Sequence, residues 1–577
     1  MGVVMQRSAI GILTALALNG CGLFVVEHDS VGADETAGAS DAGAAGSSAA
    51  GSGGKGGGAG GAGTIGGGGT SSAGSGAGAA AGASAGTPGG PNPVLDCSTA
   101  VNIETDLQVH AGSDPGKLIA NVWGSLMIDG SSNGLADLRC LQTVGGSLGL
   151  VLGSGALDAL GLLRSVNNDL TIKGNTTLAD LSALRSLGSV GGRITIEGNS
   201  ALADLAGLRL LGFVGQGLTV RGNASLLSLH GLENLTDLKE VSILENPKLL
   251  NLDGLTNLTN TTTSVDIEGN DALTNLAGLH GLHEPRSLYI VDNSSLRDVK
   301  GLEGLTSLNE ASISSNATLS NLSGLEGVTR ISSLTVNDNP KLKDLTGLDR
   351  VKSLSNIQLS GNVELEDIDA LGTSLSDMTN FELVGSPAVT GLEGLSKVTY
   401  LGTLTLTACG VNTLNGLRNL EDVNRVTLTK TQLKNLVGLG QAQVGDTLEL
   451  DGNGELESLA GLSNINQEIL NVTLNDNPKL TDLSGLEMVR TITYGLTLDS
   501  NAKLTGFTGL DNLKTVGSIS VTKHPALASL ASLTGLKTII NSAAFVENPK
   551  LSKCEIQQLI TACGAPEVDL QDNGPCN

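Results

Sequence analysis

The chain has 577 residues, 58 of them acidic and 33 basic, which gives a formal net charge of −25 at neutral pH. Such an excess of carboxylates, without clusters of Lys and Arg, argues against nucleic acid as a partner. Aromatic residues make up only 2% of the chain, so a large core must consist mainly of Leu, Ile and Val.

The first twenty residues, 1–20, have the pattern of an export signal. Arg7 ends a short basic stretch, residues 9–18 form an apolar run, and the letters LNGC end at Cys21. This ending resembles the lipobox of bacterial lipoproteins, and the resemblance implies cleavage before Cys21, a diacylglyceryl thioether on its sulfur and attachment to the lipid bilayer. Gly22 stands where the inner-membrane retention signal of such lipoproteins has Asp, which favours the outer membrane or cell surface. The alternative is an ordinary secretory signal with an incidental Cys.

Residues 21–94 predict a disordered tether. Residues 31–93 are almost wholly Gly, Ala, Ser and Thr, too poor in bulky apolar groups to bury a core. A flexible chain of about 65 residues typically spans about 45 Å. No later stretch has the roughly 20 apolar residues of a spanning helix, so we expect the protein to be anchored to the membrane without crossing it.

Residues 95–577 are dominated by an Asn that recurs about every 23 residues. Two apolar residues precede each Asn in alternation with variable ones, as in Leu170, Ile172 and Asn175, which predicts a short strand with its apolar side chains inward. Leu residues about three, six and nine positions later predict turns around a Leu core, with no room for a long helix. A fixed period of this size is typical of leucine-rich solenoids. The recurring residues are Asn175, Asn199, Asn223, Asn246, Asn270, Asn293, Asn316, Asn339, Asn362, Asn453, Asn477, Asn501 and Asn548.

Extending this register from Ser131 to Asn573 predicts about 20 coils. A buried Asn at the recurring position is expected to bond backbone groups left unpaired at the corner of each coil, forming a structural Asn ladder. Six coils carry another residue there: Ser131, Gly153, Ser386, Cys409, Thr431 and His524.

The repeat LTIKGNTTLADLSALRSLGSVGGR resembles the receptor L-domain repeat and, more distantly, the leucine-rich repeats of bacterial internalins. Internalin ladders take Asn or Cys, and Cys409 fits that alternation. The resemblance covers roughly residues 97–577 and implies a right-handed parallel β-solenoid. Such repeats bind growth factors, adhesion receptors or glycans, or have no known ligand, so the fold does not identify a partner.

Seven Cys residues fit an oxidising compartment. Cys140 falls on an inward position of the first coil and Cys97 opens the domain, so we predict that a disulfide between them closes an N-terminal cap, residues 95–140.

The C-terminal cap, residues 549–577, is expected to contain a short helix with Ser552 as N-cap, Glu555 completing a capping box and Gly564 past its end. A continuous helix holds Cys554 and Cys563 about 13 Å apart, too far for a disulfide. Cys554 with Cys576 is therefore the preferred pair, and the partner of Cys563 stays open.

We predict no catalytic residue, metal site or cofactor. His280 and His283 lie close in sequence, but no third ligand stands at a matching spacing. The outward strand positions are mostly Ser and Thr, which are also simply good strand residues. Two carboxylate pairs, Asp266 with Glu268 and Glu449 with Asp451, stand out there, and neither has a basic residue at the outward positions of adjacent strands.

The outward positions of two neighbouring strands, Asp266, Glu268, Tyr289 and Val291, form the candidate binding face. Two functions without catalysis remain open. In one, a monomeric solenoid recognises an unknown protein or glycan through this face; in the other, it is a structural spacer of the cell surface. A polysaccharide lyase or hydrolase ranks third. The site of such an enzyme gathers carboxylates with basic groups on one face, and the two carboxylate pairs here lack basic residues at the outward positions of adjacent strands.

Overall fold

The computed structural model describes residues 95–110, 116–130, 132–152, 158–373 and 375–576. They belong to one unit, Gly89–Asn577, described here by itself. The predicted export signal, Cys21 and tether lie outside the described residues. Among the residues that are described, no helix has the length and apolar character needed to cross a membrane.

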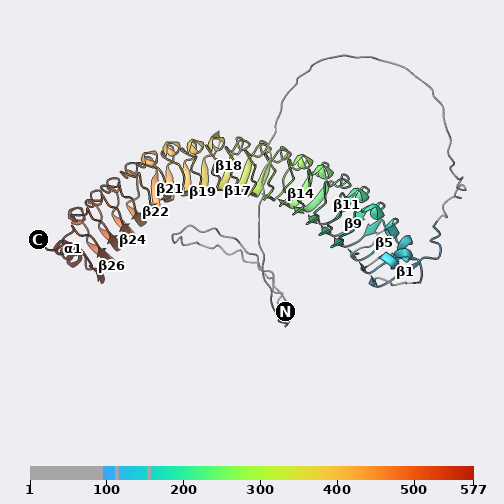
Figure 1. Ribbon diagram of the computed structural model, residues 1–577. Coiled ribbons are helices and arrows are strands. Elements are labelled where there is room, and N and C mark those ends of the chain that lie inside the picture. Colours follow the sequence, from blue (N-terminus) through green and yellow to red (C-terminus); the bar gives the residue numbers. More distant parts are fainter. Residues whose placement is uncertain (1–94, 111–115, 131, 153–157, 374, 577) are drawn as a thin grey trace, which may run out of the picture. The chain divides into compact units, whose positions relative to one another are not determined.

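One parallel sheet runs through the whole unit (Figure 1). Each strand pairs with the strand of the next coil, and the row of pairings ends at β2 and β27. Its 21 strands are β2 (Leu107–Val109), β4 (Leu126–Asp129), β6 (Leu148–Val151), β8 (Leu170–Lys173), β10 (Ile194–Glu197), β12 (Gly217–Arg221), β13 (Asp237–Leu244), β14 (Asn260–Glu268), β15 (Ser287–Val291), β16 (Ser307–Ser314), β17 (Arg330–Asn337), β18 (Ser353–Ser360), β19 (Asp377–Val384), β20 (Tyr400–Thr407), β21 (Asp422–Thr429), β22 (Gln443–Asp451), β23 (Glu468–Asn475), β24 (Thr491–Asp499), β25 (Thr515–Thr522), β26 (Thr538–Val546) and β27 (Glu567–Asp569). The predicted parallel solenoid is confirmed, and β2 adds one coil inside the N-terminal cap.

A second, shorter sheet covers one flank of the first coils. Its six strands pair in the order β1 (Val101–Ile103), β3 (Ile119–Val122), β5 (Thr143–Val144), β7 (Ser165–Val166), β9 (Ser189–Val190) and β11 (Phe213–Val214). Between the two sheets the coils touch so closely that a Cβ on Gly191 would lie 2.0 Å from the carbonyl oxygen of Asn167. From β13 onward, most coils carry one longer strand in place of the two.

Short 3-10 turns return the chain from one strand to the next. They are η1 (Ser132–Cys140), η2 (Asp158–Leu160), η3 (Ser182–Leu184), η4 (Ala206–Leu208), η5 (Asp253–Leu255), η6 (Ala277–Leu279), η7 (Asp369–Thr373), η8 (Glu393–Leu395), η9 (Asn415–Leu417), η10 (Val437–Leu439) and η11 (Ala531–Leu533). In coils without such a turn, a Gly with positive φ replaces it: Gly324 has φ 119°, and its N–H donates to Glu326 Oε2 at 2.8 Å. Among the described residues the only α-helix is α1 (Lys553–Cys563), so the expectation of no long helix within the coils holds.

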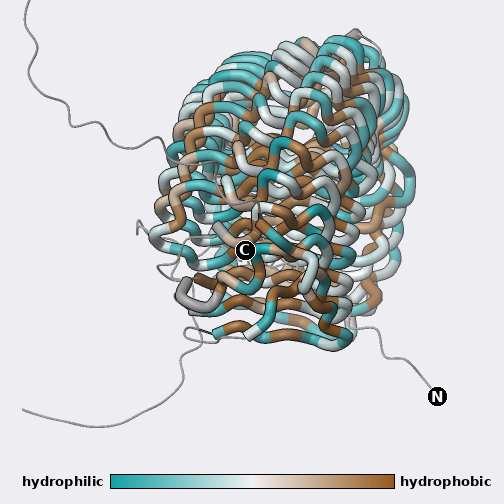
Figure 2. Tube along the Cα trace, turned by 90° about the vertical axis from the view of Figure 1, so that its right-hand side faces the viewer, coloured by the Kyte–Doolittle hydropathy of each residue, from teal (hydrophilic) through white to brown (hydrophobic). Residues whose placement is uncertain are grey.

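The core is a continuous column of inward Leu, Ile and Val side chains. Viewed along the stack, apolar and polar residues alternate around each coil (Figure 2). Because no coil can bury its Leu residues alone, each depends on its neighbours.

Both ends of the column are closed by disulfides. Cys97 bonds Cys140, and Cys554 bonds Cys576, with Cα–Cα distances of 5.7 and 5.1 Å, so both predicted pairs are confirmed. Cys563 is a free, buried thiol, and its Sγ lies 3.3 Å from the carbonyl oxygen of Leu536.

The C-terminal helix differs from its prediction at one end. Gly564 ends α1 in the left-handed conformation, as expected, but Ser552 makes no side-chain capping bond. Glu555 Oε1 instead accepts from the N–H of Leu530 at 2.6 Å and from Ser529 Oγ at 3.1 Å. The predicted capping box is therefore wrong, because the preceding coil offers Glu555 donors that local sequence does not reveal.

Candidate functional site

The ladder Asn residues all lie inside the solenoid. The thirteen predicted side chains are at most 1% exposed. Asn293 illustrates the shared geometry: its Oδ1 accepts from the backbone N–H of Asn270 at 3.2 Å, and its Nδ2 donates to the carbonyl oxygens of Ile267 at 2.9 Å and Val291 at 3.0 Å. Each amide thus ties its own strand end to the preceding coil.

Four of the six replacement positions lie among the described residues; Ser131 and Gly153 do not. Thr431 keeps one ladder link, because its N–H and Oγ1 both donate to Asn453 Oδ1, at 2.9 and 2.7 Å. Ser386 Oγ donates to the carbonyl of its own strand residue Val384 at 3.4 Å. Cys409 is buried, and burial raises the pKa of its thiol.

His524 is the only ionisable group at a described ladder position apart from the Cys409 thiol. It is fully buried; its N–H donates to Asn548 Oδ1 at 3.0 Å, and its Nε2 lies 3.2 Å from Asn501 Nδ2. Burial lowers the pKa of the imidazole to about 4, although the nearby carboxylate of Asp499 acts in the opposite direction. The neutral His524 ring therefore accepts a hydrogen bond from Asn501 Nδ2 through its Nε2, where the Oδ1 of an Asn accepts the corresponding bond in other coils.

The residue directly before the ladder position is a structural feature that the sequence analysis missed. It has positive φ in coil after coil, as in Gly174 at 69° and Asp292 at 54°, and its N–H bonds the next coil: Asp292 N donates to the carbonyl oxygen of Ser314 at 3.0 Å. Gly is the residue that takes this conformation without strain. The signal was present, because eight described coils have Gly there, but in eleven others a non-Gly residue has the positive φ: Glu245, Asp292, Ser315, Asp338, Ala408, Lys430, Asp476, Ser500, Lys523, Glu547 and Asp572.

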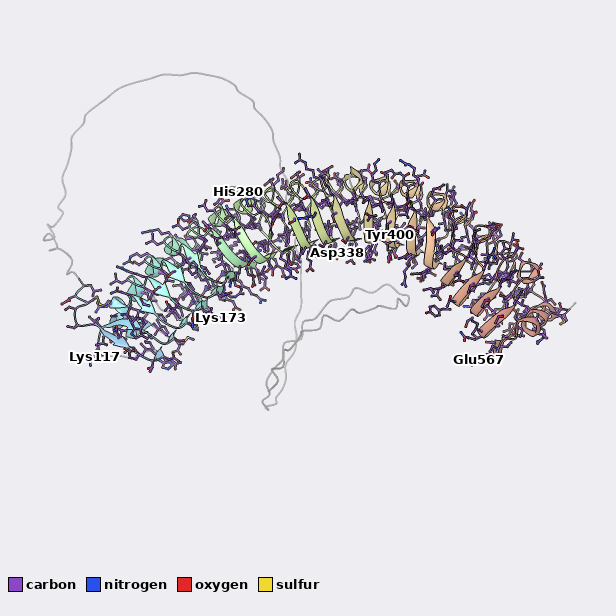
Figure 3. The ribbon with its side chains drawn as sticks, turned by 180° about the vertical axis from the view of Figure 1, so that it is seen from behind. Lys117, Lys173, His280, Asp338, Tyr400 and Glu567 are labelled. Carbon is purple, nitrogen blue, oxygen red and sulfur yellow. A yellow bond between two sulfur atoms is a disulfide. The ribbon has the colours of Figure 1, made fainter. Side chains whose placement is uncertain are left out.

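The outward residues of the long sheet line the concave side of the stack. In Figure 3, Lys173 and Asp338, at the ends of strands β8 and β17, project from the concave side, and His280 projects from the convex side. The candidate binding face lies on β14 and β15, where Asp266 pairs with Tyr289 and Glu268 pairs with Val291. The structure thus brings the four predicted residues together in two adjacent cross-strand pairs.

Asp266 is the most perturbed carboxylate on this face. Burial raises its pKa to about 6, and the charges of Glu268 and Glu240 add to the effect. No ion pair to Asp266 is found among the described residues. Burial also raises the pKa of the Tyr289 phenol, and Glu310 acts in the same direction. The face therefore combines an unpaired, half-buried carboxylate with an aromatic ring.

Basic residues near the candidate binding face pair with carboxylates outside it. Arg193 pairs with Glu240 at 2.7 Å and Arg221 with Glu245 at 2.8 Å, in the coils just before Asp266.

At the second pair, Glu449 with Asp451, a basic residue lies just beyond the outward positions of the adjacent strand β21. Lys430, directly after strand β21, is close enough to act against the rise in the pKa of Asp451 that burial and Asp476 cause. It lies just beyond the strand positions on which the prediction was based, since the chain turns there toward the ladder.

His280 and His283, which lie close in sequence, each bond a backbone carbonyl group. His280 Nδ1 lies 3.0 Å from the carbonyl oxygen of Ala277, and His283 Nδ1 lies 3.0 Å from that of Gly304. Among the described residues, no group of three or more His, Cys, Asp or Glu side chains is placed to hold a metal ion.

No protein-family model matches the sequence, and no curated protein matches it. Solved structures with a similar course of the chain include an internalin from Listeria monocytogenes (18% identity, TM-score 0.31, 67% of this chain and 88% of the internalin). They also include the plant peptide hormone receptor RGFR1 in complex with RGF2 (17%, 0.35, 82% and 81%) and an LRR protein from Leptospira interrogans (17%, 0.30, 76% and 96%). These TM-scores are all below 0.5. The coil geometry described above is that of a leucine-rich-repeat-like parallel solenoid.

Proposed function

We propose that this chain is a lipid-anchored protein of the cell envelope whose solenoid recognises a protein or glycan through its concave face. The observation that carries the recognition half of the proposal is the environment of Asp266. A half-buried carboxylate with a pKa of about 6 and no ion pair among the described residues costs stability, and strain of this kind gathers at binding sites. Tyr289 beside it offers an aromatic surface on which a sugar ring or an apolar side chain packs well.

Binding by the purified full-length chain to a glycan array, and pull-down of envelope proteins, tests this half. The double substitution Asp266→Asn with Tyr289→Ala should abolish retention of the ligand. The matched control, Thr427→Ala with Thr429→Ala, changes outward residues of β21 on the same face and should retain it. Equal retention by the two double variants would remove the site from the proposal, and a chain that retains nothing would fit a structural spacer instead.

Catalysis is the second outcome that this experiment separates. We expect binding without cleavage, because Arg193 and Arg221 are held in ion pairs with Glu240 and Glu245 and no ion pair joins a basic residue to Asp266 among the described residues. Turnover of a polysaccharide that disappears in Asp266→Asn would place the protein among the polysaccharide-active enzymes.

The anchoring half of the proposal rests on the LNGC sequence that ends at Cys21. Metabolic labelling with a fatty-acid alkyne should label the wild-type chain and leave Cys21→Ser unlabelled, since the diacylglyceryl thioether forms on the thiol. Cys563→Ser serves as the control, because that thiol is buried in the C-terminal cap. Labelling that survives Cys21→Ser contradicts the lipoprotein assignment.

A further inference from the structure

The flank sheet stops at β11, in the teal part of the ribbon (Figure 1). In the coils before it, one backbone bond repeats: Gly191 N donates to Val166 O, and Gly215 N donates to Val190 O. A second series of bonds, in which Gln216 N donates to Gly192 O, continues in the next coil, where Lys239 N donates to Gln216 O at 2.7 Å. β11 pairs with β9, and no pairing with β13 occurs among the described strands. On this flank β11 is therefore separated from β13 by the lack of ladder pairing, while the two coils stay bonded through Lys239 N and paired in the long sheet.

A cavity of about 330 Å³ opens at this separation. Its walls include the side chains of Phe213, Leu238 and Lys239 and the backbone of Gly212. Phe213 is 57% exposed, which is unusual for a large apolar side chain beside an open cavity. The carboxylate of Asp237 is the one acidic group among the residues lining it, and it already accepts from Thr236 Oγ1 and Asn260 Nδ2. The cavity has the size of sites that bury a small ligand or a large side chain.

Basic and apolar side chains surround the cavity. The basic flank comprises Leu162, Arg164, Arg185, Arg209, Leu210 and Phe213, all exposed, with Leu210 at 55% and Leu162 at 38%. Backbone bonds from Gly188 N to Arg164 O and from Gly212 N to Gly188 O stack these segments in three consecutive coils. The basic flank thus extends without interruption to the cavity wall.

The charges of the basic flank are unbalanced. Arg164, Arg185 and Arg209 form no ion pair with any residue that the structure describes, and neither does Lys239. On the concave face, by contrast, Arg193 and Arg221 are each paired with a Glu. Unpaired cations grouped around exposed apolar side chains stand out in a chain with a net charge of −25.

We propose that the basic flank and its cavity form a docking surface for an acidic segment of a partner protein. An apolar side chain of that segment enters the cavity beside Phe213, and its carboxylates reach Arg185 and Arg209. Charge complementarity selects the acidic partner, and the cavity selects a protein segment over a bilayer surface, which would cover the Leu and Phe side chains and leave the cavity empty. This surface is separate from the concave face and does not depend on the function proposed for it.

Fluorescence anisotropy with the purified full-length chain and a short synthetic peptide of alternating Glu and Leu tests the proposal. The double substitution Arg185→Glu with Arg209→Glu should raise the Kd at least about tenfold, and added salt should weaken wild-type binding. Arg418→Glu is the matched control, because Arg418 follows turn η9 in the same conformation in which Arg209 follows η4. Phe213→Ser should also weaken binding, whereas Leu250→Ser, at an equally exposed apolar side chain elsewhere, should not.

Three outcomes overturn the proposal: a peptide of alternating Lys and Leu that binds as tightly, equal affinities in the Arg185 and Arg209 double variant and Arg418→Glu, or no binding of the acidic peptide. Capture of phosphatidylglycerol vesicles through Arg185 and Arg209, without peptide binding, would assign the surface to a membrane. The milder variant Arg185→Gln with Arg209→Gln, which adds no new charge, should give an intermediate loss at an unchanged melting temperature. These substitutions are at exposed positions, so a folding defect is not expected.

Discussion

Acidification should loosen the solenoid around His524, and the size of the effect follows from its burial. The imidazole titrates near pH 6.5 in an unfolded chain and at about 4 in the folded ladder. Because the folded pKa is the lower one, the unfolded state binds the proton more strongly. The stability that depends on the neutral ring is complete above pH 6.5 and is lost as the pH falls through about 4. A difference of 2.5 pKa units corresponds to about 3 kcal/mol.

Other charges near His524 modify this value without changing its sign. Asp499 favours the protonated ring, and the Oδ1 of Asp499 lies 3.9 Å from Lys523 Nζ. Asp266 contributes with the opposite sign, because its pKa is raised to about 6 and the folded state gains stability as the pH falls below that value. Asp266 is half-buried, so solvent screening makes its contribution the smaller one.

The variant His524→Asn isolates the histidine, since it introduces the side chain found at fourteen other ladder positions. Amide hydrogen exchange in β25 and β26, measured from pH 7 to about 4, should show a loss of protection in the wild type that His524→Asn lacks. His280→Asn, an exposed change on the convex side, should follow the wild type. Parallel profiles for wild type and His524→Asn would refute the argument that a buried neutral ring closes this part of the ladder.

Three further substitutions test other parts of the structure. Asn293→Leu leaves the carbonyls of Ile267 and Val291 unpaired and should cost about 1–3 kcal/mol for each lost partner, against under about 0.5 kcal/mol for Ser314→Leu on the strand face; equal melting temperatures would show the register to be wrong. Gly191→Ala places a Cβ 2.0 Å from Asn167 O and should lower the melting temperature strongly, whereas Gly212→Ala meets no atom within 4 Å and should not, so similar shifts would contradict the tight corner. Asp266→Asn should stabilise the chain more at pH 7 than at pH 4, because it removes a carboxylate whose charged form is disfavoured by burial, and a pH-independent effect in denaturant unfolding would speak against that cause.

The period and the inward residues could be predicted from the sequence, because a solenoid imposes the same packing on every coil. Leu170, Ile172 and Asn175 occupy the positions expected for two core residues and a ladder amide. The disulfides could be predicted for a related reason: an inward Cys140 and a helical Cys554 each left one suitable partner at the same end of the chain.

What the sequence did not reveal depends on contacts between coils. Glu555 bonds the preceding coil rather than its own helix, and Lys430 reaches Asp451 because the chain turns sharply after β21. The end of the flank sheet also depends on pairing between coils, because β11 pairs with β9 and, among the described strands, not with β13. The left-handed residue before the ladder is different: Gly at this position in eight coils indicated it, and the non-Gly residues elsewhere obscured it.

Specific recognition by this chain has to reside in few positions. The inward residues are set by packing, the ladder residues by the bonds between coils, and the residue after each strand by its left-handed backbone. The outward strand positions and the flank carry none of these constraints. Ser and Thr are the most frequent residues at the outward positions, and they satisfy the sheet without unusual energetic cost. Asp266 and the Arg residues of the basic flank depart from this pattern, because they are charged groups without an ion pair among the described residues. These two surfaces are therefore where binding by the solenoid is to be sought first.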